Sequence, residues 1–317
     1  MKIMNLGSLN LDKVYAVRHF VQAGETVLAD RCEVHCGGKG LNQSIALAKA
    51  GAEVLHLGKI GPDGTALEQI LSCSGVDVSL LLPSENDSGH AIIQVNTDGQ
   101  NSIIVYGGAN QEITPAEIDQ ALTRMCAGDL FLTQNETSCV PYALQKAKKV
   151  GLKTVFNPSP ITQELLGYPL ELVDLLILNE TEAEALAGHS GSYAALLELL
   201  VAKYPGTEII LTAGKDGSYY GFGGCRVYQQ AIQARAVDTT GAGDTYCGYF
   251  IASRARGMEV KPAMELASRA AAIAVSRKGA ASSIPSLSEL KYRRLMGRPV
   301  THWLCDRSSF VPYVPDA

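Results

Sequence analysis

The sequence predicts an α/β protein in which a mostly parallel sheet carries helices on both faces, with a second, smaller β-sheet beside it. From about residue 115 onward, short apolar strands alternate with helices. This alternation is typical of a parallel sheet covered on both faces, because consecutive parallel strands need a crossover between them. Residues 13–35 and 88–108 instead contain apolar segments without helical periodicity, and we expect them to form the smaller sheet.

Composition restricts the class of protein. The 317 residues are 46% hydrophobic and 19% charged, as in an ordinary soluble globular protein. The formal net charge of −5 gives no overall attraction for nucleic acid or for an acidic membrane surface. No segment is typical of a membrane span or a signal peptide. We therefore expect a cytoplasmic protein with neither nucleic-acid nor membrane partners.

The cysteines do not suggest a disulfide framework or a metal site. The eight cysteines are scattered and form no C-x-x-C pair. Cys32, His35 and Cys36 lie close together in sequence, but no second ligand cluster is present to complete a zinc site. We expect free, mostly buried thiols.

The first expected strand, residues 3–7, is followed by polar side chains. Asn10 and Asp12 are two residues apart, so they share a face if the chain continues extended. A carboxylate and a carboxamide on one face suit the binding of neighbouring hydroxyl groups, whereas ordinary turn chemistry is the alternative.

A glycine-rich turn at 37–40 precedes a helix expected at 44–51 and carries Lys39 and Asn42. It matches neither the Walker A pattern nor a dinucleotide fingerprint. Gly37 and Gly38 would allow the backbone to approach a small polar ligand. Lys39 would then bind a hydroxyl group, or else be an ordinary solvated lysine.

Three of the other expected strands end in polar residues or are followed directly by them. Glu136 follows the strand at 130–132, Asn179 and Glu182 follow the strand at 175–178, and Thr212 ends the strand at 209–212. In a parallel sheet these ends lie along one edge, where a ligand crevice forms. The other expected strands are 54–61, 88–96, 100–106, 154–157, 219–222 and 225–228, and the expected helices are 65–74, 140–150, 194–202, an alanine-rich 262–275 and a last helix from Ser286.

The segment 236–245 reads as an anion-binding turn with a carboxylate beside it. Gly241, Ala242 and Gly243 immediately precede an apolar helical run. Their amides would therefore lie at a helix N-terminus, which favours negative charge such as a phosphate. Asp244 would be a general base in phosphoryl transfer, or simply an acidic residue in a first helical turn, where such residues are common.

Several motifs together resemble one enzyme family. They are residues 7–12, 24–26, 37–43, 179–184, 238–244 and 274–280. In this order they resemble the ribokinase-like (phosphofructokinase-B) carbohydrate kinases, over roughly residues 3–290. The resemblance implies one kinase domain over 1–317 with a three-layer αβα architecture, and a β lid formed by about 13–35 and 88–108. Residues 291–317 have no family counterpart that we can match.

The resemblance also implies a reaction, the transfer of a phosphoryl group from ATP to a primary hydroxyl of a small sugar, with D-ribose giving ribose 5-phosphate. Asp244 would be the catalytic base, and the amides of Gly241, Ala242 and Gly243 would form the anion hole. The positions that match the family's sugar contacts are Asn10, Asp12, Gly38, Lys39, Asn42, Glu136 and Asp244.

Mg²⁺, K⁺ and a homodimer formed through the lid are implied in the same way. The positions matching nucleotide contacts are Asn179, Glu182, Thr212, Gly214 and Gly243, with Glu182 placing Mg²⁺ through water. Those matching the potassium site are Asp238, Thr240, Ala274, Arg277, Gly279 and Ser283, where Arg277 would contribute its carbonyl, since its side chain cannot ligate a cation.

Departures from the family pattern leave the acceptor open. Leu41 stands where alanine is usual, and His90 lies in the lid hairpin where an apolar residue is usual. If either faces the sugar, the acceptor would change to another furanose such as fructose, or to a nucleoside. A sugar sensor without catalytic activity is a further alternative, which the intact Asp244 and Asn179-x-x-Glu182 disfavour. A nicotinamide dehydrogenase is disfavoured by the absence of G-x-G-x-x-G.

Overall fold

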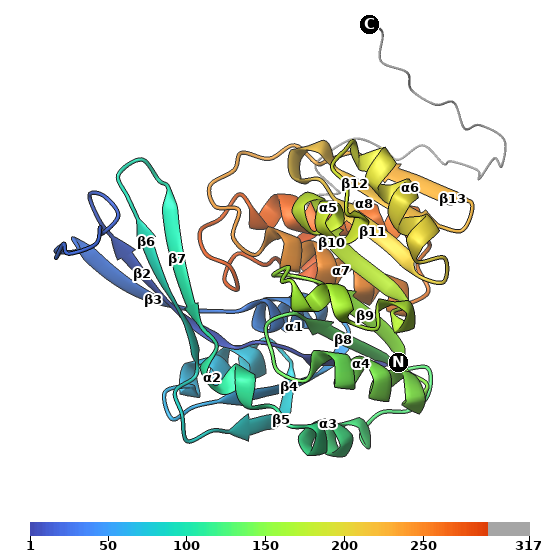
Figure 1. Ribbon diagram of the computed structural model, residues 1–317, viewed down its shortest axis with the longest axis horizontal. Coiled ribbons are helices and arrows are strands. Elements are labelled where there is room, and N and C mark those ends of the chain that lie inside the picture. Colours follow the sequence, from blue (N-terminus) through green and yellow to red (C-terminus); the bar gives the residue numbers. More distant parts are fainter. Residues whose placement is uncertain (291–317) are drawn as a thin grey trace, which may run out of the picture.

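The structure is a computed structural model that describes residues 1–290, so the expected tail at 291–317 lies outside the described residues. Its centre is a nine-stranded sheet with the order β13-β12-β11-β10-β9-β8-β1-β4-β5 (Figure 1). Strands β11 to β5 in this order are parallel, and β12 and β13 continue the sheet as an antiparallel hairpin. The strands are β1 (Lys2–Leu6), β4 (Glu53–Ile60), β5 (Asp77–Pro83), β8 (Leu130–Gln134), β9 (Lys153–Asn157), β10 (Leu175–Asn179), β11 (Glu208–Thr212), β12 (Ser218–Phe222) and β13 (Cys225–Gln229).

The strand order reverses between β1 and β8. From β1 the chain continues through β4 to β5 on one side, whereas β8 leads through β9, β10 and β11 on the other. A crevice forms outside the carboxyl ends of the strands at such a reversal, because the following connections diverge to opposite faces of the sheet. The topology alone therefore places the candidate site beyond the ends of β1 and β8.

Helices cover both faces of the large sheet, so the protein has three layers. Alternate strand residues point to opposite faces: in β1, Ile3 belongs to one buried cluster, and Met4 and Leu6 belong to the other. The first cluster includes side chains of α1 (Lys39–Lys49), α2 (Thr65–Cys73), α7 (Ala242–Ala255) and α8 (Val260–Ala274). The second includes α3 (Pro115–Leu122), α4 (Val140–Val150), α5 (Glu180–Ala187) and α6 (Tyr193–Lys203).

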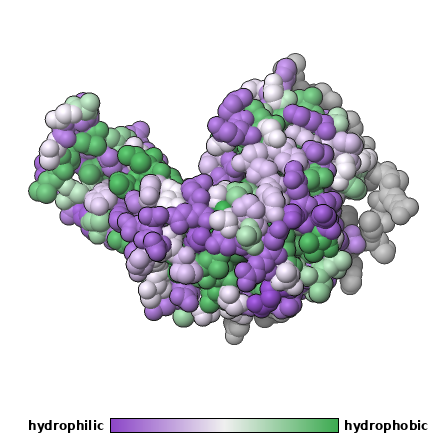
Figure 2. All heavy atoms as spheres, turned by 60° about the horizontal axis from the view of Figure 1, so that its bottom comes forward, coloured by the Kyte–Doolittle hydropathy of each residue, from purple (hydrophilic) through white to green (hydrophobic). Residues whose placement is uncertain are grey.

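A separate four-stranded sheet projects from this body, to the left in Figure 1. Its order is β3-β2-β6-β7, and its strands are β2 (Asn10–Ala16), β3 (Arg31–Gly37), β6 (Gly89–Val95) and β7 (Asn101–Tyr106). Strand β7 is exposed along its whole length, although it contains Ile103, Ile104 and Val105. In Figure 2 apolar side chains gather on this projecting part.

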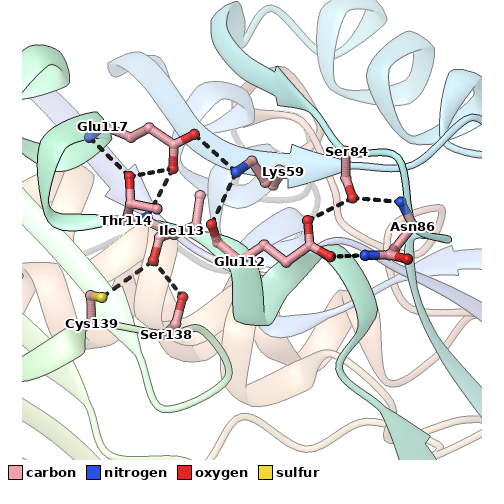
Figure 3. Close-up of polar contacts among 9 residues, drawn as sticks. All are labelled: Lys59, Ser84, Asn86, Glu112, Ile113, Thr114, Glu117, Ser138 and Cys139. Atoms are coloured by element: carbon pink, nitrogen blue, oxygen red, sulfur yellow. Dashed lines mark hydrogen bonds and ion pairs between the residues drawn. The ribbon is translucent and has the colours of Figure 1, made fainter.

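The segments that join β6 and β7 to the body are fastened together by a polar network (Figure 3). The carboxylate of Glu112, which follows β7, accepts hydrogen bonds from Ser84 Oγ at 2.7 Å and Asn86 Nδ2 at 2.6 Å, both of which precede β6. Lys59 of β4 donates to the carbonyl of Glu112 at 2.9 Å and pairs with Glu117 of α3 at 2.9 Å. Because Lys59 is mostly buried, these contacts fix the base of the small sheet relative to β4.

Several elements differ from the sequence-based expectation. Helix α1 begins at Lys39 rather than 44, so the glycine-rich turn continues directly into the helix. Strand β5 and helices α3 and α5 were not predicted. Both helices start with a complete capping box, Thr114 with Glu117 and Asn179 with Glu182, which was the local signal for them. The alanine-rich helix α8 packs mainly on α7, so its small residues allow close helix–helix packing rather than contact with the sheet alone.

The cysteines within residues 1–290 are free, as expected, but most of them are not buried. Of the described cysteines, Cys247 in α7 is buried, whereas Cys32, Cys73, Cys126 and Cys225 are exposed. They lie at a strand start, a helix end or a turn, where the chain meets solvent. No helix within residues 1–290 is both long and apolar enough to cross a membrane.

Candidate active site

The candidate site lies where the N-termini of α1 and α7 meet beyond the carboxyl end of β1. Helix α7 begins after Gly241, which has a left-handed φ of 73° that favours glycine. The amide of Gly243 lies in the first turn, where N–H groups lack intrahelical partners. A Cβ at Gly243 would meet no atom within 4 Å, so open space adjoins this amide. The helix start therefore fits an anion, as predicted for Gly241, Ala242 and Gly243.

Asp244 lies in the same first turn, with only 8% of its surface exposed. Its two carboxylate oxygens accept hydrogen bonds from two neighbouring residues of α1. Asn42 Nδ2 donates to Oδ2 at 3.0 Å, and Gln43 Nε2 donates to Oδ1 at 2.9 Å. Two donors hold the carboxylate at a fixed orientation in a site that is otherwise rich in acidic groups. This partnering goes beyond the ordinary role of an acidic residue in a first helical turn.

The predicted sugar contacts lie on three elements around this carboxylate. Asn10 and Asp12 share one face of β2, as the two-residue spacing predicted. Asn10 Oδ1 accepts a hydrogen bond from Asn110 Nδ2 at 2.8 Å, which holds the Asn10 amide in place. Gly38 has a φ of 93°, and a Cβ there would come within 2.9 Å of the Ser8 carbonyl, so glycine is required.

Lys39 and Glu136 connect the start of α1 to the end of β8. Glu136 Oε2 accepts from the backbone amide of Lys39 at 3.0 Å and from the hydroxyl of Ser8. Burial raises the pKa of Glu136, although Lys39 and Ser8 oppose the shift. Burial by itself would lower the pKa of Lys39, but Asp244, Glu136 and Glu182 outweigh it, so that pKa is raised. Lys39 is therefore the cation among these carboxylates and not a solvated surface lysine.

Asp12 is a second carboxylate whose proton affinity is altered. Burial, together with nearby Glu136, raises the pKa of Asp12 to about 6, while His35 opposes the shift. His35 is the cross-strand partner of Asp12 in the β2–β3 pair, on the same face of the small sheet. Asp12 thus changes its charge just below neutral pH, in contrast to an ordinary exposed aspartate.

The predicted nucleotide contacts lie side by side at the ends of β10 and β11. Asn179 is paired with Thr212 in the sheet. Asn179 and Glu182 form a reciprocal capping box at 2.9 and 3.0 Å, so this pair also has a structural role at the start of α5. Glu182 is 4% exposed, and both of its oxygens accept from Asn179. Any Mg²⁺ would therefore meet this carboxylate through water rather than by displacing Asn179. Gly214 has a φ of 55° and open space around it.

The predicted potassium positions come from two loops that the structure brings together. Asp238 Oδ2 accepts from the amide of Gly279 at 2.9 Å, and Asp238 Oδ1 accepts from Thr240. Ala274 and Ser283 are buried, and the Arg277 side chain donates to the Ser283 carbonyl at 3.4 Å and pairs with Glu289. Asp238 is an oxygen donor between the two loops, of a kind that suits a monovalent cation. Within residues 1–290 there is no group of three His, Cys, Asp or Glu side chains that could hold a metal.

The two residues that placed the acceptor in doubt point away from the Asp12 face. Leu41 is fully buried in the core with Leu9 and Ile45. His90 is the partner of Leu11 across β2 and β6, so it lies on the opposite face of the small sheet from Asn10 and Asp12. Its ring packs against that of Tyr106 in a tilted arrangement, with the ring centroids 5.0 Å apart.

Sequence reasoning missed three side chains that hold the site residues. Gln43 binds Asp244, Ser8 binds Glu136, and Asn110 binds Asn10. Gln43 adjoins Asn42 in the glycine-rich motif, which was a signal for it. Asn110 had no comparable signal, because its partners are about 100 residues away.

The arrangement combines an anion-binding helix start, a buried carboxylate and a polar crevice, which together suit phosphoryl transfer to a hydroxyl group. Residues 1–287 match the family model described as the pfkB family carbohydrate kinase. The chain is 36% identical over 292 residues to a ribokinase of Haemophilus influenzae, covering 90% of this chain and 95% of that protein. It is 34% identical over 300 residues to a deoxyribokinase of Salmonella typhi, covering 91% and 97%.

A solved structure agrees with this assignment. The structure of Arabidopsis thaliana ribokinase complexed with ribose and ATP superimposes with a TM-score of 0.81 at 27% identity, covering 92% of this chain and 97% of that chain. The fold, the helix-start turn with its carboxylate and these comparisons agree, and the chain belongs to the pfkB family of carbohydrate kinases.

Proposed function

We propose that this kinase transfers the γ-phosphoryl group of ATP to the primary hydroxyl of D-ribose. The observation that carries the proposal is the position of Asp244, a buried carboxylate held by Asn42 and Gln43 in the first turn of α7. The relatives named ribokinase, and the Arabidopsis ribokinase complexed with ribose and ATP, support the choice of acceptor and donor.

In this mechanism the sugar lies between the small sheet, which acts as a lid, and the start of α7. Asn10, Asp12, Gly38, Lys39, Asn42 and Glu136 bind its hydroxyls. The Asn42 Oδ1 atom is buried without a hydrogen-bond partner among the described residues, which fits a sugar hydroxyl as donor. Asp244 takes the proton of the primary hydroxyl as that oxygen attacks phosphorus in line. The amides of Gly241, Ala242 and Gly243 bind the transferring group as its charge develops.

Asn179, Glu182, Thr212, Gly214 and Gly243 are proposed to bind the nucleotide. Mg²⁺, held through water near Glu182, and K⁺, held by Asp238, Thr240, Ala274, Arg277, Gly279 and Ser283, would supply positive charge near the phosphates. Asp238 ties the segment before α7 to the Gly279 loop. K⁺ bound between these two segments would thereby hold the residues that lead into the anion-binding turn in place.

The acceptor decides between two closely related activities. The deoxyribokinase relative, at 34% identity, favours 2-deoxyribose as the second candidate.

We expect wild-type protein assayed for ATP turnover to use ribose fastest among ribose, 2-deoxyribose, fructose, fructose 6-phosphate, adenosine and cytidine, and to be stimulated by K⁺. Turnover confined to another acceptor would change the assigned substrate and leave the proposed mechanism unchanged. No turnover on any acceptor, with a sugar still raising thermal stability, would instead indicate a sugar sensor.

Asp244→Asn tests the assignment of the base. Removing the group that accepts the proton should lower kcat by roughly 10²- to 10⁴-fold, with sugar affinity by calorimetry changed only a few-fold. Asp119→Asn on the exposed surface of α3 is the control, because Asp119 forms its hydrogen bonds with the surface residues Tyr142 and Lys146. Turnover of the Asp244 variant close to wild type would contradict the mechanism.

Asp12 should make sugar binding depend on pH. Its pKa of about 6 means that the carboxylate becomes protonated, and loses its charge, as the pH falls through 6. We expect the KM for sugar to rise about tenfold between pH 7 and pH 5, since only the ionised form binds well. Asp12→Asn should bind sugar more weakly at pH 7 and show no such rise. A rise that persists in this variant would assign the effect to another group.

We propose that the lid also forms a homodimer in the cytoplasm. Its edge strand β7 exposes Ile104 and Val105, each 63% exposed, on opposite faces, and unpaired apolar edge strands favour association. Analytical ultracentrifugation of wild type should give a dimer. Ile104→Glu or Val105→Glu, whichever face forms the contact, should weaken it at least tenfold. A wild-type monomer at micromolar concentration, or two variants that dimerise normally, would refute the proposal.

A further inference from the structure

A buried chain of side-chain amides extends from Asp244 into the core of the protein. Gln43 is the link between the base and this chain: its Nε2 donates to Asp244 Oδ1 and to Asn157 Oδ1, both at 2.9 Å. Its Oε1 accepts from Gln134 Nε2 at 2.8 Å. Gln43 has no exposed surface and Gln134 is 1% exposed. Gln43 is therefore positioned to act on Asp244 without contacting a sugar in the crevice.

The chain continues beyond Gln134, whose Nε2 donates in both directions, to Gln43 and to Asn5. Gln134 Nε2 also donates to Asn5 Oδ1 at 2.9 Å. Asn5 Nδ2 donates to Ser44 Oγ at 2.8 Å and to the Gly40 carbonyl at 2.9 Å. These hydrogen bonds join strands β1 and β8 to helix α1.

His56 terminates the chain and fixes its polarity. Burial lowers the pKa of His56 to about 4, so the ring is neutral at pH 7. Its Nε2 lies 3.2 Å from the Gly7 carbonyl, which can only accept, so Nε2 carries the proton. Nδ1 must then accept from Ser44 Oγ, at 2.8 Å. The Ser44 hydroxyl is thus committed to His56 as a donor and is left to accept from Asn5.

This polarity prevents the Gln43 amide from turning over. In the reversed orientation its oxygen would face Asp244 Oδ1 and Asn157 Oδ1, and its NH₂ group would face the NH₂ group of Gln134. Three repulsive contacts would replace three hydrogen bonds in a dry environment, where unsatisfied polar groups are costly. Asp244, Asn157 and the chain from His56 to Gln134 together therefore determine that Gln43 presents an N–H to Asp244.

We propose that Gln43 is a positioning residue for Asp244, and that Gln134, Asn5, Ser44 and His56 set its orientation. This inference rests on the proposed function of Asp244 as general base. Together with Asn42, Gln43 occupies one lone pair of each carboxylate oxygen. The remaining lone pairs are then directed at a fixed point in the crevice, where a substrate hydroxyl would be deprotonated.

Gln43→Met and Gln43→Glu test the proposal, because both retain most of the side-chain volume. Methionine removes the N–H donor, and glutamate replaces it with an acceptor. We expect kcat to fall roughly 10- to 100-fold in each, as a misaligned base loses the reactive geometry. Sugar affinity measured by calorimetry should change less than threefold. This separation of kcat from binding is the readout that a purely structural role would not produce.

Two control variants separate the expected loss of kcat from a general loss of stability and from failure of the general-base mechanism. Thr154→Val removes a buried hydroxyl that donates to the Leu172 carbonyl at 2.7 Å, on the same strand as Asn157 but at its opposite end. It should lower the melting temperature and leave kcat unchanged. Asp244→Asn is assayed in parallel.

The outcomes are distinct. If Asp244→Asn loses turnover but Gln43→Met keeps kcat within threefold of wild type, the positioning role is refuted and the general base remains. Equal losses of kcat and sugar affinity in Gln43→Met would also refute it, because they indicate general distortion of the crevice. If Asp244→Asn is fully active, the proposed function itself fails.

Discussion

The close contact between helices α1 and α7 is the constraint on which the site depends. A Cβ at Gly248 would come within 2.4 Å of the Ala46 Cβ, so only glycine allows the two helices to approach this closely. One turn earlier in each helix lie Asp244 and Asn42, which are joined at 3.0 Å. The helices come from segments about 200 residues apart and start side by side. Their packing in the core therefore places the carboxylate against its donors.

A second close approach holds α1 at the end of β1. Gly7 and Gly40 face each other so closely that a Cβ on either would lie 2.4 Å from the other's Cα. This contact positions the first turn of α1, which contains Asn42. It also lets Asn5 of β1 reach the Gly40 carbonyl. The two glycines thus allow β1 and α1 to lie close enough for the hydrogen bonds of the polar chain to form between them. Larger side chains at these positions would separate the strand from the helix.

Local sequence signals predicted the fold and the residues nearest the chemistry, but not the contacts that hold them. Asp244 and the amides before it were predictable because one short segment combines a glycine turn, an acidic residue and an apolar helix. The mostly parallel sheet with helices on both faces was predictable from strand–helix alternation. The contacts around Asp244 were not, since its donor Gln43 binds Gln134 and Asn157, which come from different elements, and no local pattern links them. Similarly, Asn179-x-x-Glu182 was interpreted as a ligand motif, and its capping of α5 was overlooked.

Charge balance explains why the Asp244 carboxylate needs such extensive support. Glu136, Asp244 and Glu182 lie around Lys39, which is their shared cation, and Asp12 lies near Glu136. A carboxylate in this setting would move toward Lys39 unless other donors held it. Neutral amides can hold it without adding charge, so Asn42 and Gln43 orient Asp244 while Lys39 stays available to the sugar and to the other carboxylates. The neutral state of His56 fits the same requirement, because a protonated ring would donate from both nitrogens and could not accept from Ser44. The chain of amides that supports the Asp244 carboxylate therefore ends at a histidine in the core that remains uncharged.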